Sequence, residues 1–237
     1  MSRIDDRAWV REQYASESNL AARKSVYGNI EGPDAREIVF RAIADCRPRR
    51  LLEVGGGEGE LAVRIAGELG ANVVGIDQSQ RMVEIQQSKG IDARVGDVEN
   101  LPFDDGEFDT AVAAWMLYHA GDLDRALAEL ARVLRSGGRL VAVTNAVDHL
   151  RELTELAGVP ELNRATRFRS ENGEDALRRH FRHVERRDVR GWVIMDDDAV
   201  RRYAASWSDL AQAVDQLPLA EPLRVRRAST IFIAEKD

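Results

Sequence analysis

Four of the five residues from 55 to 59 are glycine, and this segment limits the possible folds more than any other feature of the chain. The apolar run at residues 51–54 before it is typical of a buried strand, and residues 61–69 after it have helical spacing. A strand that passes through glycines into a helix exposes bare backbone at its carboxyl end, where a ligand can lie. The segment therefore predicts a ligand site in an α/β fold.

Helices and strands are predicted to alternate from about residue 34 to residue 144. Helices are expected to begin near Asp34, Ser79 and Asp122, and the last of these to close at the Ser-Gly-Gly segment of residues 136–138. The further strands are expected at residues 73–77, 93–95, 108–116 and 139–144, with a turn at residues 105–106. Helices between successive strands provide crossover connections, so the pattern predicts a parallel, doubly wound sheet.

The pattern is weaker after residue 145. We expect helices at residues 148–158 and 172–181, strands at residues 184–194 and 228–233, and one or two helices in the first 30 residues. Asp198 is predicted to cap a helix whose apolar stripe runs to Val214. Three members of that stripe fit either a core or a lid over a substrate, namely Tyr203, Trp207 and Leu210.

Composition limits the class of protein. The 237 residues suffice for one large α/β domain, or a domain with a small cap, and the net charge of −7 argues against a nucleic-acid partner. Arginine runs at residues 178–182 and 224–227 favour solvated helix faces or strand edges, with an anionic-ligand surface as the alternative. Cys46 is the only cysteine, which excludes an internal disulfide.

The sequence also predicts in which cellular compartment the protein resides. No stretch approaches the roughly 20 apolar residues of a membrane span, so no membrane partner is expected. The first residues lack the apolar core of a secretory signal. A single cysteine and these two features together favour the cytoplasm.

Charge around the glycines separates two ligand classes. Residues 57–62 also fit the dinucleotide fingerprint G-x-G-x-x-A, and Asp77 follows about 20 residues later, where it could bind a ribose. However, Glu53, Glu58 and Glu60 crowd the loop, and a pyrophosphate would be repelled there. A ligand with positive charge and no phosphate, such as S-adenosylmethionine (SAM) with its sulfonium and ammonium groups, fits better.

Several motifs in order and spacing resemble those of class I SAM-dependent methyltransferases of the type 11, small-molecule group, which includes ubiquinone- and menaquinone-biosynthesis enzymes. They are LEVGGGEG at 52–59, VGID at 74–77, GDVENLPF at 96–103, FDTAV at 108–112, YH at 118–119 and AELARVLRSGGRL at 128–140.

The resemblance implies a mostly parallel, seven-stranded Rossmann-like sheet with helical cap elements at both ends. Residues 1–30 would form an N-terminal helical cap, and residues 31–237 the SAM-binding domain. Within that domain the core motifs would span residues 51–144, and substrate-cap segments would span 145–175 and 191–222.

The resemblance also assigns cofactor contacts. Around the methionine moiety of SAM it places Glu53, Gly55, Gly57 and Gly59. Asp77 would accept hydrogen bonds from the ribose hydroxyls. Around the adenine it places Gln78, Met82, Asp97 and the N–H of Val98, and around the sulfonium Ala114, Trp115 and His119. Tyr14 and Arg23 belong to an N-terminal stretch that would fold over the cofactor.

The expected reaction is in-line methyl transfer to an unidentified small molecule, releasing S-adenosylhomocysteine (SAH). His119 is the candidate general base, although a histidine after a strand is more often structural. Substrate contacts are expected from Tyr14, Tyr118, Asn145 and His149. No metal is expected, because Asn145, Asp148 and His149 do not reproduce the ligand pattern of metal-dependent methyltransferases.

Three alternatives remain open on the sequence. An NAD(P)-dependent oxidoreductase could use the fingerprint at residues 57–62, but there is no Tyr-x-x-x-Lys pair for hydride transfer, and the lysines are Lys24, Lys89 and Lys236. An RNA methyltransferase would need a basic groove. A non-catalytic subunit would bind SAM without turnover.

Overall fold

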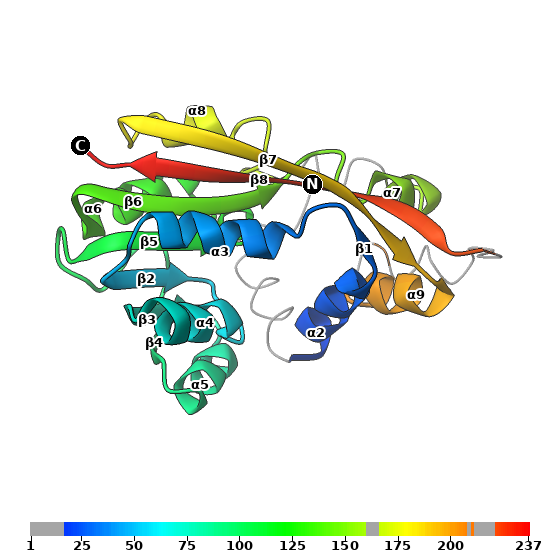
Figure 1. Ribbon diagram of the computed structural model, residues 1–237, viewed down its shortest axis with the longest axis horizontal. Coiled ribbons are helices and arrows are strands. Elements are labelled where there is room, and N and C mark those ends of the chain that lie inside the picture. Colours follow the sequence, from blue (N-terminus) through cyan, green and yellow to red (C-terminus); the bar gives the residue numbers. More distant parts are fainter. Residues whose placement is uncertain (1–16, 160–165, 208–209, 211–220) are drawn as a thin grey trace.

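The computed structural model describes residues 17–159, 166–207, 210 and 221–237 (Figure 1). The described strands form one sheet of eight strands, in the order β1-β7-β8-β6-β5-β2-β3-β4. The strands are β1 (Ile30–Glu31), β2 (Arg50–Val54), β3 (Asn72–Asp77), β4 (Asp92–Val95), β5 (Phe108–Ala114), β6 (Leu134–Asn145), β7 (His183–Met195) and β8 (Leu223–Glu235).

Helices precede, connect and cover these strands. They are α2 (Glu17–Ser25), α3 (Ala35–Asp45), α4 (Glu60–Leu69), α5 (Gln80–Ser88), α6 (Leu123–Val133), α7 (Arg151–Leu156), α8 (Gly173–Leu177) and α9 (Asp197–Ala205), with short 3₁₀ turns η1 (Val26–Gly28) and η2 (Leu117–His119). Tyr14, a predicted site residue, lies outside the described residues.

The predicted parallel core is confirmed. Strands β4, β3, β2, β5 and β6 pair in parallel along the sheet. Their helices begin where the sequence predicts, because short polar side chains cap them: Asp34 accepts from the N–H of Arg36, Ser79 from that of Met82 and Asp122 from that of Arg125. The chain therefore has the expected α/β, doubly wound class of fold.

The antiparallel side of the sheet differs from the prediction. Seven strands are expected, but β1 adds an eighth, whose two residues pair antiparallel with β7 and are too few to give a pattern. Strand β8 begins at Leu223 rather than at residue 228, because it pairs with β7 without interruption from Leu223 to Glu235. The two strands thus project beyond the rest of the sheet (Figure 1).

Several predicted helix ends are wrong, and α7 and α8 are both shorter than the helices expected at residues 148–158 and 172–181. Asp196, not Asp198, caps α9, and its Oδ1 accepts from the N–H of Ala199 at 2.8 Å, since β7 ends at Met195 and leaves the first of three aspartates in the capping position. The Ser-Gly-Gly segment of residues 136–138, predicted to end α6, lies inside β6, which starts directly after α6 at Leu134. The predicted end of the α9 stripe, Val214, lies outside the described residues.

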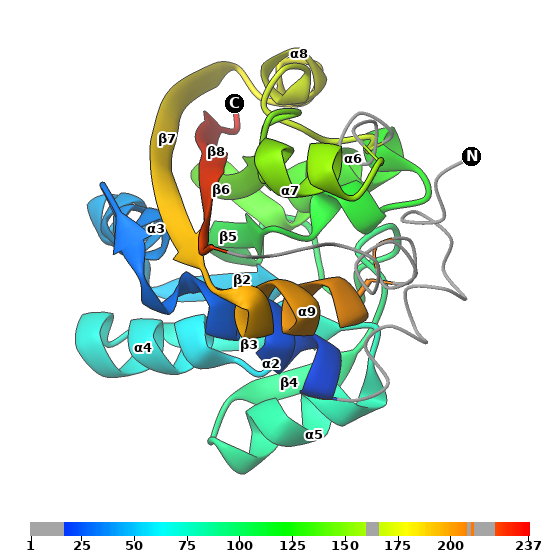
Figure 2. The same cartoon turned by 90° about the vertical axis from the view of Figure 1, so that its right-hand side faces the viewer.

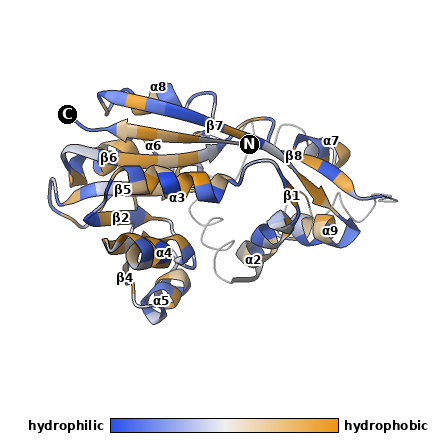
Figure 3. Cartoon of the chain, viewed as in Figure 1, coloured by the Kyte–Doolittle hydropathy of each residue, from blue (hydrophilic) through white to orange (hydrophobic). Residues whose placement is uncertain are grey.

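Hydrophobic cores fill both faces of the sheet and its projecting end. On one face α6 and α8 contribute Leu127, Leu130 and Leu177, and on the other α3 and α4 contribute residues such as Ile43 and Ile65 (Figure 2). Strand β6 and the C-terminal half of β8 are largely hydrophobic, whereas β7 and the projecting end of β8 carry hydrophilic stretches (Figure 3). None of the described helices is long and apolar enough to cross a membrane.

A third cluster packs α7, α9 and η1 against the far ends of β7 and β8. Helix α2 lies against α9 beside this cluster (Figure 1). These elements stand next to the carboxyl ends of β2, β3 and β5. At β2 the chain order reverses, because β3 pairs on one side of it and β5 on the other, and ligands of doubly wound sheets bind at such a point.

Candidate functional site

A cavity of about 470 Å³ lies at the reversal point, between the strand ends and the layer formed by α2, η1 and α9. Most of the predicted site residues line it: Arg23, Glu53, Gly55, Gly57, Asp77, Gln78, Val98, Ala114, Trp115, Tyr118, His119, Asn145 and His149. Three predicted cofactor contacts do not line it, namely Gly59, Met82 and Asp97. The tertiary fold thus brings together residues from four separate motifs.

The glycine loop after β2 is shaped by left-handed backbone and by close packing. Gly55, Gly57 and Gly59 have φ angles of +65°, +57° and +74°, which residues other than glycine rarely adopt. A Cβ at Gly55 would lie 2.7 Å from the Cβ of Met116, in the loop after β5. The two loops that flank the cavity therefore touch, and glycine is required where they do.

Glu53, at the end of β2, presents an unsatisfied carboxylate oxygen. Its side chain is 2% exposed, and its Oε2 has no hydrogen-bond partner. Gly56 makes room for it, because a Cβ at that position would lie 2.5 Å from Oε2. Burial, and then the nearby charge of Asp77, raise the pKa of Glu53 to about 7.

Asp77, at the end of β3, is held by backbone N–H groups. Its Oδ2 accepts from Gly57 at 3.1 Å and its Oδ1 from Ser79 at 2.9 Å. Burial raises the pKa of Asp77 to about 6, and these backbone hydrogen bonds oppose the rise. Each carboxylate oxygen can accept a further hydrogen bond. Two poorly solvated carboxyl groups thus face one cavity, and a cationic ligand would stabilise their ionised forms.

The other two glutamates of the loop are compensated. Lys24 Nζ of α2 lies 2.8 Å from Glu58 Oε2 and 3.0 Å from Glu60 Oε2. The sequence predicts three acidic side chains around the loop. Among the residues that the structure describes, Glu53 alone of the three is buried and has no cation within ion-pair distance. The lysine also ties α2 to the glycine loop, so the N-terminal helix helps to enclose the cavity.

The end of β5 places a strained tryptophan in the cavity wall. Trp115 has a φ of +54°, a conformation that costs energy for a residue with a side chain. Its Nε1–H donates to Asn145 Oδ1 at 3.1 Å, and Ser229 Oγ donates to the same oxygen at 2.9 Å. Beyond it, the buried His119 packs edge-on against Tyr118, with ring centroids 4.5 Å apart.

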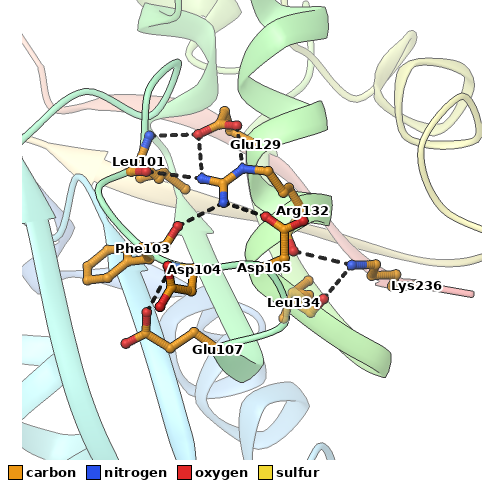
Figure 4. A network of polar contacts seen from close by, with 9 residues as sticks. All are labelled: Leu101, Phe103, Asp104, Asp105, Glu107, Glu129, Arg132, Leu134 and Lys236. Carbon is orange, nitrogen blue, oxygen red and sulfur yellow. Dashed lines mark hydrogen bonds and ion pairs between the residues drawn. The ribbon is translucent and has the colours of Figure 1, made fainter.

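The loop after β4 is fixed by a polar network on its outer side (Figure 4). Arg132 of α6 donates to the carbonyl oxygens of Leu101 at 3.0 Å and Phe103 at 2.8 Å, and pairs with Asp105 and Glu129. Closer to the cavity, Asp97 Oδ1 accepts from the N–H of Glu99 at 3.0 Å. Met82, a predicted adenine contact, is fully buried and does not line the cavity.

The cavity wall also contains residues that were not predicted from the sequence, among them Tyr27, Arg36 and Arg227. Arg227 belongs to the arginine run at residues 224–227, for which a solvated strand edge is the favoured prediction. Alternation along β8 was the available signal, since Val225 and Arg227 are buried and Arg224 is exposed. Tyr27 and Arg36 flank a strand of two residues and carry no such pattern.

His149 is held in one protonation state. The N–H of Ala228 donates to its Nδ1 at 3.1 Å, and its Nε2 lies 3.2 Å from the hydroxyl oxygen of Tyr27. Burial lowers the pKa of His149 to about 4, so the ring is neutral near pH 7. Because Nδ1 accepts a hydrogen bond, the proton must be on Nε2, which donates to Tyr27.

In the part of the chain that the structure describes, no three His, Cys, Asp or Glu side chains gather in a metal-binding arrangement. The groups that line the cavity are instead a carboxyl pair, aromatic rings and arginines. This set suits an organic ligand with both charged and apolar parts.

Comparison with known proteins gives a consistent result. Residues 52–142 match the family model described as a methyltransferase domain. An uncharacterized methyltransferase of Mycobacterium tuberculosis is 38% identical over 132 residues, which are 53% of this chain and 52% of that protein. A ubiquinone/menaquinone biosynthesis C-methyltransferase of a Geobacter species is 37% identical over 102 residues, 39% of this chain and 43% of that protein. The chain thus spans about half the length of these relatives.

A solved structure resembles the whole fold. The SAM-dependent methyltransferase from Thermotoga maritima described as a possible histamine N-methyltransferase superposes with a TM-score of 0.63 at 21% identity, over 95% of this chain and 99% of that one. At this identity the likeness concerns the fold alone.

Proposed function

We propose that this protein transfers a methyl group from SAM to a small-molecule acceptor, because residues 52–142 form a class I, type 11 SAM-dependent methyltransferase domain. The observation that carries the proposal is the unsatisfied, buried Oε2 of Glu53 beside the carboxyl group of Asp77. A ligand with an ammonium group would pair with Glu53, and ribose hydroxyls would donate to Asp77.

The same pair disfavours the oxidoreductase alternative. A dinucleotide would bring a pyrophosphate to the start of α4, where it needs N–H donors and no competing anions. There the N–H of Gly57 already donates to Asp77, and the carboxyl group of Glu53 lies under Gly56. Two further negative charges at this place would raise the electrostatic energy of the complex.

SAM, when bound, supplies a methyl group that is already activated for displacement. The chain would contribute binding and alignment, which can account for much of the rate acceleration of such a displacement. Trp115 and Ala114 would form the wall next to the reacting centre, with Tyr118 and His119 at its border. His119 is the candidate base for an acceptor that must lose a proton.

Calorimetric titration of the purified chain with SAM, SAH and NAD tests the proposal. We expect SAM and SAH to bind in the micromolar range and NAD not to bind. Saturable NAD binding, or no response to millimolar SAM, would contradict it. Mass spectrometry of SAH formed in mixtures of small molecules then tests turnover, since a non-catalytic subunit would bind SAM and consume none.

A further inference from the structure

Arg227 is a buried cation in the cavity wall, and the cofactor site as proposed does not use it. Its side chain lies on β8, and the residue is 7% exposed. One terminal nitrogen, Nη2, donates to the carbonyl oxygen of Pro33 at 2.5 Å, whereas Nε has no hydrogen-bond partner. Among the residues that the structure describes, no carboxylate lies within ion-pair distance of it.

The described groups around Arg227 do not compensate its positive charge. Burial lowers the pKa of Arg227, and the carboxylate of Asp34, which opposes this effect, is exposed and engaged as the cap of α3. Arg36 adds a second positive charge near the same end of the cavity. A buried, unpaired guanidinium weakens a fold, and a hydrophobic side chain of similar size would be more stable there. Its presence therefore indicates a ligand.

Tyr27 provides a second donor, and its hydroxyl group lies close enough to Arg227 for the two to interact electrostatically. Because His149 donates through Nε2 to the hydroxyl oxygen of Tyr27, the hydroxyl proton of Tyr27 is left to donate elsewhere. Burial raises the pKa of Tyr27, so this proton stays on the oxygen. An N–H and an O–H donor at one end of a cavity are suited to the two oxygens of a carboxylate.

The two ends of the cavity have opposite requirements. Glu53 and Asp77 lie at the ends of β2 and β3, whereas Arg227 lies on β8, three strand spacings from β2, or ~14 Å across the sheet. The walls near β8 include Ile30, Val189 and Tyr203. On the basis of the proposed function, we infer that the methyl acceptor is a small carboxylic acid with an apolar or aromatic body, and that Arg227 and Tyr27 bind its carboxylate.

The test uses three matched probe sets on the full chain, with and without saturating SAH. Each set comprises an acid and its primary amide: 4-hydroxybenzoate, 3-phenylpropionate and indole-3-acetate with their amides. Calorimetry or ligand-observed NMR is expected to show at least one acid binding about tenfold or more tightly than its amide. Equal binding within all three pairs, or no binding by any acid, would overturn the inference.

Variants then assign the preference to the arginine. Arg227→Met should abolish the difference between acid and amide, and Arg227→Lys should retain part of it. Arg224→Met is the matched control, because Arg224 lies exposed on the same strand and should leave the difference unchanged. An Arg227→Met protein that still prefers the acid would overturn the inference.

Thermal unfolding separates a binding role from a structural one. If Arg227 serves a ligand, the midpoint of Arg227→Met in the absence of ligand should equal or exceed that of the wild type. A large decrease, with the acid preference of Arg227→Lys unchanged from the wild type, would mean that Arg227 supports the fold instead. SAH binding is measured in the same samples, so failure of the cofactor proposal is recognised separately from failure of the carboxylate proposal.

Discussion

At the scale of single residues, the site is defined by charges that the fold has removed from water. Glu53 and Arg227 are both buried, and each has a polar atom without a partner. The energy of leaving such groups unpaired is large compared with the stability of a domain. Two opposite charges left unpaired in one cavity, on strands that are not neighbours, indicate two separate ligand groups.

Glu53→Gln should weaken SAM binding by about 10- to 100-fold, the usual effect of losing a hydrogen bond to a charged group. The amide keeps the shape of the side chain but offers no charge to an ammonium group. Calorimetry with SAM measures the change. Glu68→Gln, on the exposed face of α4, is the control and should bind SAM normally. Unchanged affinity in Glu53→Gln would remove Glu53 from the site.

The raised pKa values of Glu53 and Asp77, about 7 and about 6, predict how stability depends on pH. The folded protein holds these protons more tightly than the unfolded chain does, where the values are near 4.5 and 3.8. The resulting contribution to the free energy of unfolding is fully present below about pH 4 and is lost as the pH rises through 6 and 7. Denaturant titrations between pH 4.5 and 8 should show a smaller loss in Glu53→Gln.

Cofactor binding should depend on pH in the opposite direction. An ammonium group binds the ionised form of Glu53, so SAM affinity should rise about tenfold between pH 6 and pH 8, as a pKa of about 7 requires. Titration at several pH values measures this. A flat profile in the wild type, or the same rise in Glu53→Gln, would show that another group is responsible.

At the scale of elements, the glycine loop between β2 and α4 is limited by its neighbours as well as by its own backbone. Gly55 and Gly70 have nearly the same φ, +65° and +66°. They differ in space, because a Cβ at Gly55 meets Met116 and a Cβ at Gly70 meets nothing within 4 Å. The pair therefore separates backbone strain from crowding.

Gly70→Ala should lower the free energy of unfolding by about 1 kcal/mol, the cost of the left-handed conformation alone. Gly55→Ala should cost about 1–3 kcal/mol more, because Met116 must move. Urea unfolding measures both variants. Equal losses would mean that the loops after β2 and β5 do not pack as closely as described.

The stability of the loop after β4 should likewise depend on a neighbouring element, because Arg132 of α6 donates to its backbone. Arg132→Gln should lower the free energy of unfolding by about 2 kcal/mol, because the carbonyl oxygens of Leu101 and Phe103 lose charged donors (Figure 4). The neighbouring Arg135 is exposed, and its side chain donates to no carbonyl oxygen of the described residues. Arg135→Gln is therefore the control and should unfold like the wild type.

At the scale of the whole molecule, the cavity lies between a rigid sheet and a layer assembled from distant parts of the chain. Arg23 of α2 donates to Ser206 Oγ at 3.3 Å and lies 3.8 Å from the ring centroid of Trp207, just after α9. These contacts join positions more than 180 residues apart in sequence. The layer has a smaller core of its own, built on the projecting ends of β7 and β8 (Figure 1).

A ligand that fills the cavity should stabilise this layer. We expect SAH to slow amide hydrogen exchange in α2, α9 and the first turn of α4, since local opening of these segments would expose the ligand. Helix α6, which packs on the opposite face, serves as the internal control. Protection confined to α6, or absent throughout, would contradict the site described here.

The sequence by itself determined the parallel core and the family of the domain. Apolar runs, capping residues and glycines act through local contacts, and local patterns report them directly. Asp77 and the glycine loop were therefore identified, and the resemblance to class I methyltransferases is confirmed by the match of residues 52–142. The roles of the individual cofactor contacts stay predictions.

Only the tertiary structure decided which charges remain unpaired and what closes the cavity. Lys24 neutralises Glu58 and Glu60 but not Glu53, and the pairing of β8 with β7 buries Arg227 rather than exposing it. The cap of α9 at Asp196 and the strand β1 likewise follow from the long β7. Such features depend on contacts between distant segments, and no local pattern encodes them because burial and charge pairing are properties of the packed chain.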